Sequence, residues 1–361
     1  MQRRTIAFAL ALGFAPMLVP SAALAQYQLT NLSSNQVKQA RHDDPLLVNG
    51  WGLVHAPGSP WWVSDNNSGW STLYDQAGNQ VKQLKVLIPT AGNGPSSPSG
   101  LNGPGSPTGI VWNGSSEFKV GGSPAVFLFA TLDGTISGWA PQKNFNQAVI
   151  RVDTTAKANP HPAVYTGLAI TNKASGNRLY AADMANNKVD VYDGTFTPVK
   201  LAVGAFTDAS IPAGFAPFGI QDLNGLVYVT FASTTGGSGG FVERFTEDGT
   251  PVTPGRPLIQ GAPLNQPWGL TLASKRFGPL SNTLLVSNNT NNGTINAFDI
   301  GNGTFVGTVK DASGKVISID QLWGIGFGDG AGKNGGINQL FFTAGPSNNV
   351  AGTFGTITVV Q

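Results

Sequence analysis

The chain has no cysteine, and it is poor in charge and in histidine. Of its 361 residues none is cysteine, three are histidine and 11% are charged, against about 25% in an ordinary soluble protein. The absence of cysteine excludes disulfides, a thiol nucleophile, thiolate metal ligands and a lipid anchor on cysteine. Stability must then come from a hydrophobic core, and a chain of this length is long enough to bury one.

Long apolar runs are also missing, except at the N-terminus. Arg3 and Arg4 precede an apolar run over residues 6–19, and small residues at 23–25 form a cleavage site. This pattern predicts a signal peptide over residues 1–25 and an exported protein, periplasmic or extracellular. No later run is long and apolar enough to span a bilayer, so we expect no membrane insertion after cleavage.

Excess charge of either sign is absent once the signal is removed. Without Arg3 and Arg4 the 21 basic residues fall to the number of acidic ones, which is 19. A neutral surface is not suited to holding a polyanion, so we expect no nucleic-acid partner. We expect a monomer.

Glycine is abundant, with 48 residues, about twice the usual share of roughly 7%. Glycine with many Asn, Pro and Thr is typical of short strands joined by turns, an all-β chain. One pattern recurs at intervals of 50 to 58 residues: glycine before an aliphatic residue, at Gly52, Gly109, Gly167, Gly219, Gly269 and Gly324. An aromatic residue or threonine precedes each one: Trp51, Thr108, Thr166, Phe218, Trp268 and Trp323. Such a period indicates propeller blades.

Strand-like runs follow each glycine, at residues 61–64, 126–131, 178–183, 226–231, 283–288 and 339–344. Further runs at 81–88, 148–153 and 199–204 read as fourth strands. We predict one domain over residues 26–361, a six-bladed β-propeller of four-stranded blades starting near residues 50, 107, 165, 217, 267 and 322. The last unit lacks a fourth strand, and we expect Tyr27–Leu32 to supply it and close the ring.

Long links between blades and turns after the second strands should share one face. The link over residues 90–107 is rich in Gly, Pro, Ser and Asn, and such loops are either functional or plain spacers. Aromatic and amide side chains near this face suit a neutral polar ligand such as a sugar or lactone. The candidate residues are Asn49, Trp51, Phe218, Gln266, Trp268, Gln321 and Trp323. The alternative is that the tryptophans are packing between blades.

The turns after the second strands are rich in Asp and Asn. Such residues tighten turns, which explains most of them. Their oxygens would also suit a hard cation such as calcium at the central opening. The candidate ligands are Asp65, Asp133, Asp183 and Asn288. His42 and His161 lie in loops of the same face and could serve as a base or a metal ligand, or have no such role.

Several segments, among them NGWGL, DGTISGW, PAGFAPFGIQ and DQLWGIGFGDG, resemble a family of uncharacterised exported bacterial propeller proteins, some of which carry PEP-CTERM sorting tails. The chain ends in ITVVQ without such a tail, so we expect it to be soluble. A more distant similarity, to NHL-repeat and gluconolactonase-like propellers, implies calcium-dependent hydrolysis. Those calcium enzymes carry a glutamate near the first inner strand, whereas the first glutamate here is Glu117.

Two functions follow. The first is a non-catalytic exported propeller that binds a neutral small ligand or a protein partner through the long-loop face and needs no cofactor. The second is a lactonase or esterase in which a central calcium polarises a carbonyl and activates water. The dominance of Asn and Gly in the loops favours the first.

Overall fold

The computed structural model describes residues 26–91, 104–155, 161–171 and 176–360. The predicted signal peptide and much of the link over 90–107 lie outside the described residues. The described residues form short β-strands and one 3-10 turn, η1 (Gly278–Leu280). Among them no helix has the length and apolar character needed to cross a bilayer.

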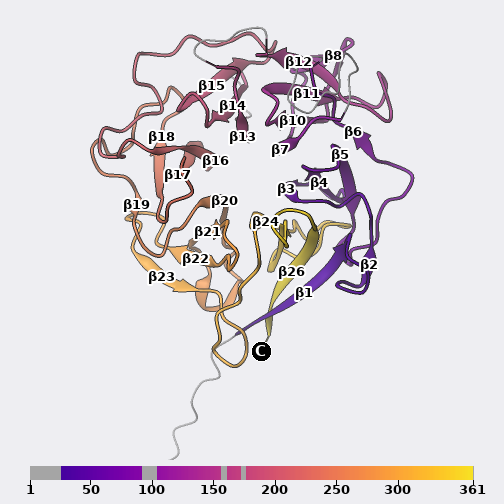
Figure 1. The fold of residues 1–361 in the computed structure, drawn as a ribbon, viewed down its shortest axis with the longest axis vertical. Coiled ribbons are helices and arrows are strands. Elements are labelled where there is room, and N and C mark those ends of the chain that lie inside the picture. The colour runs from indigo at the N-terminus through magenta and orange to yellow at the C-terminus, as the bar shows by residue number, and fades with distance from the viewer. Residues whose placement is uncertain (1–25, 92–103, 156–160, 172–175, 361) are drawn as a thin grey trace, which may run out of the picture.

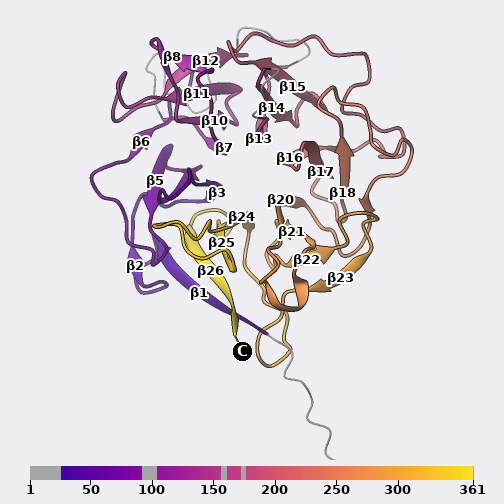
Figure 2. The ribbon, with the colours of Figure 1, turned by 180° about the vertical axis from the view of Figure 1, so that it is seen from behind.

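Six sheets, antiparallel except where β2 joins β1, stand around a central axis, which confirms the predicted six-bladed propeller (Figure 1 and Figure 2). The first three blades contain these strands: β3 (Gly50–Val54), β4 (Trp61–Asp65), β5 (Trp70–Tyr74) and β6 (Val86–Leu87); β7 (Pro107–Trp112), β10 (Phe127–Thr131), β11 (Thr135–Trp139) and β12 (Val149–Asp153); β13 (Tyr165–Thr171), β14 (Arg178–Asp183) and β15 (Lys188–Asp193). A small hairpin of β8 (Lys119–Val120) and β9 (Ser123–Pro124) is inserted in blade two.

The other three blades contain these strands: β16 (Phe215–Leu223), β17 (Leu226–Ser233), β18 (Phe241–Phe245) and β19 (Ile259–Gln260); β20 (Pro267–Leu272), β21 (Leu284–Asn288), β22 (Ile295–Phe298) and β23 (Phe305–Thr308); β24 (Leu322–Phe327), β25 (Gln339–Ala344), β26 (Thr353–Val360) and β1 (Gln26–Ser34), with β2 (His42–Asp43) added outside β1. The innermost strands are β3, β7, β13, β16, β20 and β24, each with one of the six repeated glycines.

The predicted fourth strand of blade three, at residues 199–204, is wrong. Val199 N–H donates to the Val191 carbonyl at 2.8 Å, but the chain then turns, with Ala205 N–H donating to the Ala202 carbonyl at 3.1 Å. Val203, at the end of the segment, is fully exposed. Val199 and Leu201 are partly buried against the core of blades three and four, but the turn at residues 202–205 ends the backbone pairing that a fourth strand would need.

Each repeated glycine lies where the next blade's backbone comes too close for a side chain. A Cβ on Gly219 would lie 1.9 Å from the carbonyl oxygen of Trp268 in blade five. A Cβ on Gly109 would lie 2.2 Å from the amide nitrogen of Leu168 in blade three. The period in the sequence therefore records a steric requirement, since inner strands converge on the axis.

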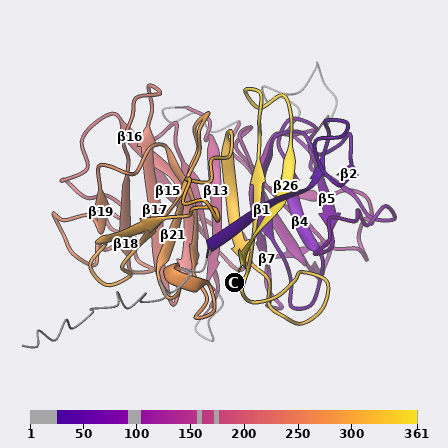
Figure 3. The same ribbon diagram turned by 90° about the horizontal axis from the view of Figure 1, so that it is seen from below.

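The N-terminal strand closes the ring as predicted and is slightly longer than expected. β1 pairs with β26 from Gln26 opposite Val360 to Ser34 opposite Thr353. In the side view of Figure 3, β1 crosses the outside of the molecule next to β26. Tyr27 adds a link to blade five: its hydroxyl donates to the Phe277 carbonyl at 2.8 Å and accepts from Leu280 N–H at 3.3 Å. Closure covers the outer edge of the last sheet, along β26.

Candidate functional site

One face of the ring carries both the links between blades and the turns after the second strands. The strand pairing sets this, because the start of β3, at Gly50, lies opposite the end of β4, at Asp65. Pro267 and Asn288 are paired in the same way in blade five. We call this the long-loop face, and all predicted site residues belong to it or lie just beneath it.

An aromatic plug formed by Trp51, Phe218, Trp268 and Trp323 lies at the axis below this face. Trp51 and Trp323 are stacked with ring centroids 3.6 Å apart, and Trp268 meets both edge-on at about 6 Å. Each of the four side chains is at most 8% exposed. The predicted ligand-binding rings therefore pack on one another. They span several blades across the axis and do not only fill the space between neighbours.

The amides Asn49, Gln266 and Gln321 occupy equivalent positions three residues before the repeated glycine. All three have left-handed backbone conformations, with φ of 53°, 50° and 49°. Their carbonyls accept hydrogen bonds from the turns after the second strands. Asn49 also accepts from the Trp323 indole N–H at 3.0 Å. Their recurrence before Trp-Gly is thus explained by turn geometry, and a ligand contact at these amides stays a prediction.

Below the plug the axis holds little space. A cavity of about 40 Å³ is lined by the repeated glycines and the aliphatic residues that follow them. That volume suits about one or two water molecules. A sugar or lactone would not fit there, so any ligand of that size must bind on the long-loop face or at its rim.

The four predicted metal ligands hold backbone amides. Asp133 Oδ2 accepts from Ser106 N–H at 2.7 Å, Asp183 Oδ1 from Val164 N–H at 3.1 Å and Asn288 Oδ1 from Asn265 N–H at 3.0 Å. These three donors lie in the links that lead into the first strands. The oxygens thus fasten link to turn in three blades. In the described part of the chain no three His, Asp or Glu side chains are grouped so as to hold a metal ion.

Asp65 is the most buried of these groups. It is 0% exposed, and its Oδ2 accepts from both the amide and the hydroxyl of Thr72, at 3.1 and 2.8 Å. Burial raises the pKa of the Asp65 carboxyl well above its usual range, since the charged form loses its hydration. Calcium binds the charged form of a carboxyl, and burial disfavours that form here, so Asp65 is poorly suited as a ligand.

A charged cleft of about 480 Å³ lies between blades two and three, and both Asp183 and His161 line it. Lys188 Nζ lies 2.7 Å from Asp190 Oδ1 and 3.8 Å from Asp183 Oδ2. Asp190 Oδ2 also accepts from the Tyr165 hydroxyl at 2.8 Å. Burial raises the pKa of Asp183. The carboxylates of Asp183 and Asp190 are thus already paired with Lys188 and hydrogen-bonded within the protein.

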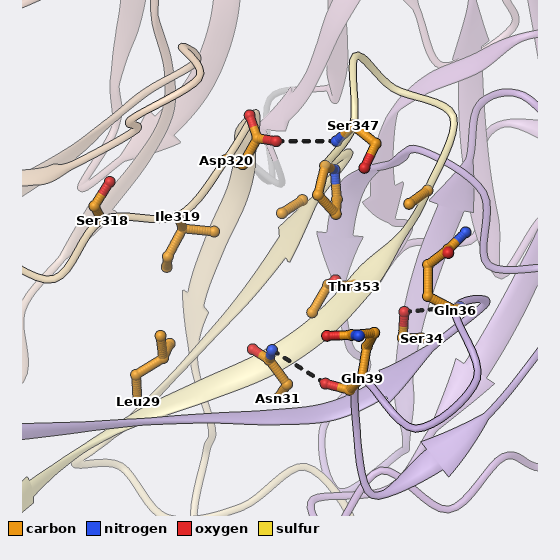
Figure 4. A pocket seen from close by; sticks show the side chains of 13 residues that line it. Leu29, Asn31, Ser34, Gln36, Gln39, Ser318, Ile319, Asp320, Ser347 and Thr353 are labelled. Carbon is orange, nitrogen blue, oxygen red and sulfur yellow. Dashed lines mark hydrogen bonds between the residues drawn. The ribbon is translucent and has the colours of Figure 1, made fainter.

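A second hollow, of about 420 Å³, opens at the rim of the long-loop face between blades five and six (Figure 4). We call it the rim groove. Its lining comes from β1 and the loop after it, from the link before β24 and from the segment where β25 turns into β26. The residues are Leu29, Asn31, Ser34, Gln36, Gln39, Ser318, Ile319, Asp320, Ala344, Pro346, Ser347, Ala351 and Thr353.

Amides, hydroxyls and aliphatic groups make up almost all of this lining. Asp320 is its one charged side chain, and its Oδ2 accepts from Ser347 N–H at 2.9 Å. Leu29 rises from β1 toward Ile319, and Asn31 Nδ2 reaches the Gln39 carbonyl at 3.4 Å (Figure 4). Sequence reasoning missed this groove. The one available signal was the predicted pairing of Tyr27–Leu32 with the last blade, which brings the N-terminal strand to the last link.

No family model matches the chain. Two uncharacterised proteins of Acanthamoeba polyphaga mimivirus are similar to it, at 29% and 28% identity. Each match covers 94% of this chain and 82% or 87% of the relative. These relatives are viral, which corrects the bacterial family expected above. Neither the sorting tail nor export finds support in them.

Solved propellers share the fold. A streptogramin B lyase matches with a TM-score of 0.50 at 14% identity, over 94% of this chain and 100% of its own. A Staphylococcus aureus virginiamycin B lyase matches with a TM-score of 0.51 at 14% identity, over 93% of this chain and 100% of its own. At this identity the likeness establishes the propeller fold alone. The chain is an all-β, six-bladed propeller, related in fold to lyase-type propellers.

Proposed function

We propose that the protein is a non-catalytic binding propeller that holds an uncharged partner in the rim groove. The observation that carries this proposal is the lining of the groove, where amides and hydroxyls surround aliphatic groups with one carboxylate. Groups that both donate and accept suit a ligand that is polar but neutral. This keeps the expected ligand class and moves its site from the axis to the rim.

The absence of catalysis is part of the proposal. Nucleophile, base and acid must be poised to react, and the acidic groups of the long-loop face are instead engaged in holding amides or Lys188. We also propose export, on the basis of residues 1–25, and action as a monomer.

The test exploits the cysteine-free chain. A single cysteine in Gln36→Cys, labelled with an environment-sensitive dye, reports on the rim groove, and Lys200→Cys on an exposed part of blade three is the matched control. Titration with maltose, with an uncharged blocked peptide and with acidic and basic versions of that peptide is expected to change only the Gln36→Cys signal, and only with the uncharged probes. Equal responses from both labelled positions, or preference for a charged probe, would refute the proposal.

A calcium-dependent hydrolase remains the second candidate, because Asp183 and His161 share a cleft large enough for a small ester or lactone. If this function is correct, calcium raises the melting temperature and supports hydrolysis of a lactone such as gluconolactone. Asp183→Asn should remove both effects. If neither stability nor hydrolysis responds to calcium, the binding function is favoured.

A further inference from the structure

The rim groove is longer than one small ligand needs. A second hollow, of about 750 Å³, shares Leu29 and Ser318 with it and continues along β1 to Tyr27 and Val360. From Ser34 to Tyr27 the strand rises by roughly 24 Å at about 3.4 Å per residue. An extended chain of about seven residues has this length, and only its middle part can pair with β1, because both ends of the strand's outer edge already have backbone partners.

The outer edge of β1 has a gap in its pairing along this groove. Tyr27 N–H donates outward to the Lys310 carbonyl at 3.1 Å, and β2 pairs with Ser33 and Ser34 at the other end. Because the direction of backbone groups alternates along a strand, Leu29 points its N–H and carbonyl to the same side as Tyr27. Within the part of the chain that the structure describes, no backbone partner meets Leu29 on that side. This is an open place for another strand.

Leu29 and Val316 line the two hollows, and Val37 and Val350 are next in sequence to the lining residues Gln36 and Ala351. Val37 and Val350 are 70% and 67% exposed, and Leu29 and Val316 are more than a third exposed. Asn35 joins the loops of Val37 and Val350, since its Oδ1 accepts from Gly352 N–H at 2.8 Å. Exposed aliphatic groups clustered on one rim mark an interaction surface. The rim groove also has no aromatic ring on which a sugar could stack.

Charge limits the partner further. Asp320 is the one charged group of the rim groove, and the second hollow adds Asp311 and Lys315, whose charges cancel. Lys315 N–H donates to Asp311 Oδ1 at 3.0 Å. A strongly charged chain would lose hydration in this groove and would gain at most one counter-charge, the carboxylate of Asp320.

We propose that the partner is an extended, uncharged polypeptide segment with aliphatic side chains, which adds as a strand to the outer edge of β1 at Leu29. This inference rests on the proposed function and names the partner class of the same groove. Backbone pairing at Leu29 supplies direction and register, and Val37, Val350 and Val316 contact alternate side chains of the segment.

The test uses the full chain and a blocked heptapeptide of alternating threonine and valine, with a version carrying proline at its third and fifth positions. Affinity is measured by titration calorimetry. Leu29→Pro removes the outward N–H, whereas Leu29→Ala removes the side chain and keeps the N–H. Proline is tolerated on an edge strand where the N–H faces solvent, so Leu29→Pro should still fold. A double variant, Val37→Lys with Val350→Lys, changes only exposed side chains. It provides an independent test of the groove if Leu29→Pro does not fold.

We expect the peptide to bind at least tenfold more weakly to Leu29→Pro than to Leu29→Ala, and the proline peptide to bind at least tenfold more weakly than its parent. The double lysine variant should also lose at least tenfold. Equal affinity of the two peptides, or of the two Leu29 variants, would overturn the inference. Binding of maltose but not of the peptide would overturn it too and leave the proposed function intact. If no uncharged probe binds in the groove, both proposals fail.

Discussion

The tyrosine that ties the N-terminal strand to blade five offers a sharp test of ring closure. Tyr27 is 4% exposed, and its hydroxyl bonds the Phe277 carbonyl and Leu280 N–H. Tyr27→Phe keeps the aromatic side chain and its packing, but it leaves the Phe277 carbonyl and the Leu280 N–H without their hydrogen-bond partner. Each unsatisfied buried polar group costs about 1–3 kcal/mol, so with both groups at the low end we expect a net loss of about 2 kcal/mol.

The size of the expected shift in melting temperature follows from the length of the chain. At about 2.1 cal/mol/K per residue, 361 residues give an unfolding entropy of roughly 0.76 kcal/mol/K, so 2 kcal/mol lowers the melting temperature by about 3 °C. Differential scanning calorimetry resolves this. Tyr228→Phe is the matched control. Tyr228 is similarly buried, at 3% exposed, and its hydroxyl makes no hydrogen bond to a described residue. A shift for Tyr27→Phe no larger than that of the control would refute the closure argument.

Three further predictions concern stability. Gly219→Ala should lower the free energy of unfolding in urea by about 1–3 kcal/mol or more, because its Cβ would meet the Trp268 carbonyl. In the control Gly307→Ala the Cβ meets only the end of the Leu280 side chain, so the loss should be less than about 1 kcal/mol. Equal losses would contradict the steric account. Burial, with a contribution from Asp208, raises the pKa of Glu243 from 4.5 to about 7. The folded state therefore binds this proton more tightly, and the stability that Glu243 contributes is present below about pH 4.5 and lost as the pH rises to about 7. Glu243→Gln should remove a fall on the order of 3 kcal/mol between pH 4.5 and 7, and an unchanged pH slope would count against it. Asp65→Asn should cost no more than about 1.5 kcal/mol, because burial disfavours the charged form of this carboxyl and an amide oxygen can still accept from the Thr72 amide and hydroxyl; a loss of several kcal/mol would mean that the charge is needed.

Much of the fold could be predicted because its strongest constraint is local and periodic. Positions 219 and 109 have no room for a side chain larger than that of glycine, and this requirement recurs once per blade. The closing strand was predictable because the last unit lacked one and residues 27–32 had no unit of their own. The fourth strand of blade three was not, because Val199 and Leu201 pack against the core although the chain turns away from the sheet edge at residues 202–205.

The candidate site was harder to predict for physical reasons. Trp51 and Trp323 look like an open binding surface in the sequence, but four such rings near one axis exclude water best by packing on each other. Asp183 and Asn288 recur at the turns because each fastens a link through its amide. The rim groove combines Leu29 with Ser318 and Ser347, which are brought together only when the ring closes.

The most direct measurement of the central claim is hydrogen exchange of the full chain with and without the uncharged threonine-valine heptapeptide, followed by mass spectrometry. The account predicts added protection in peptides covering residues 27–34, with smaller changes at 316–320 and 346–351, and none at residues 183–190 of the charged cleft. Protection confined to the charged cleft, or no protection at β1 at saturating peptide, would contradict it.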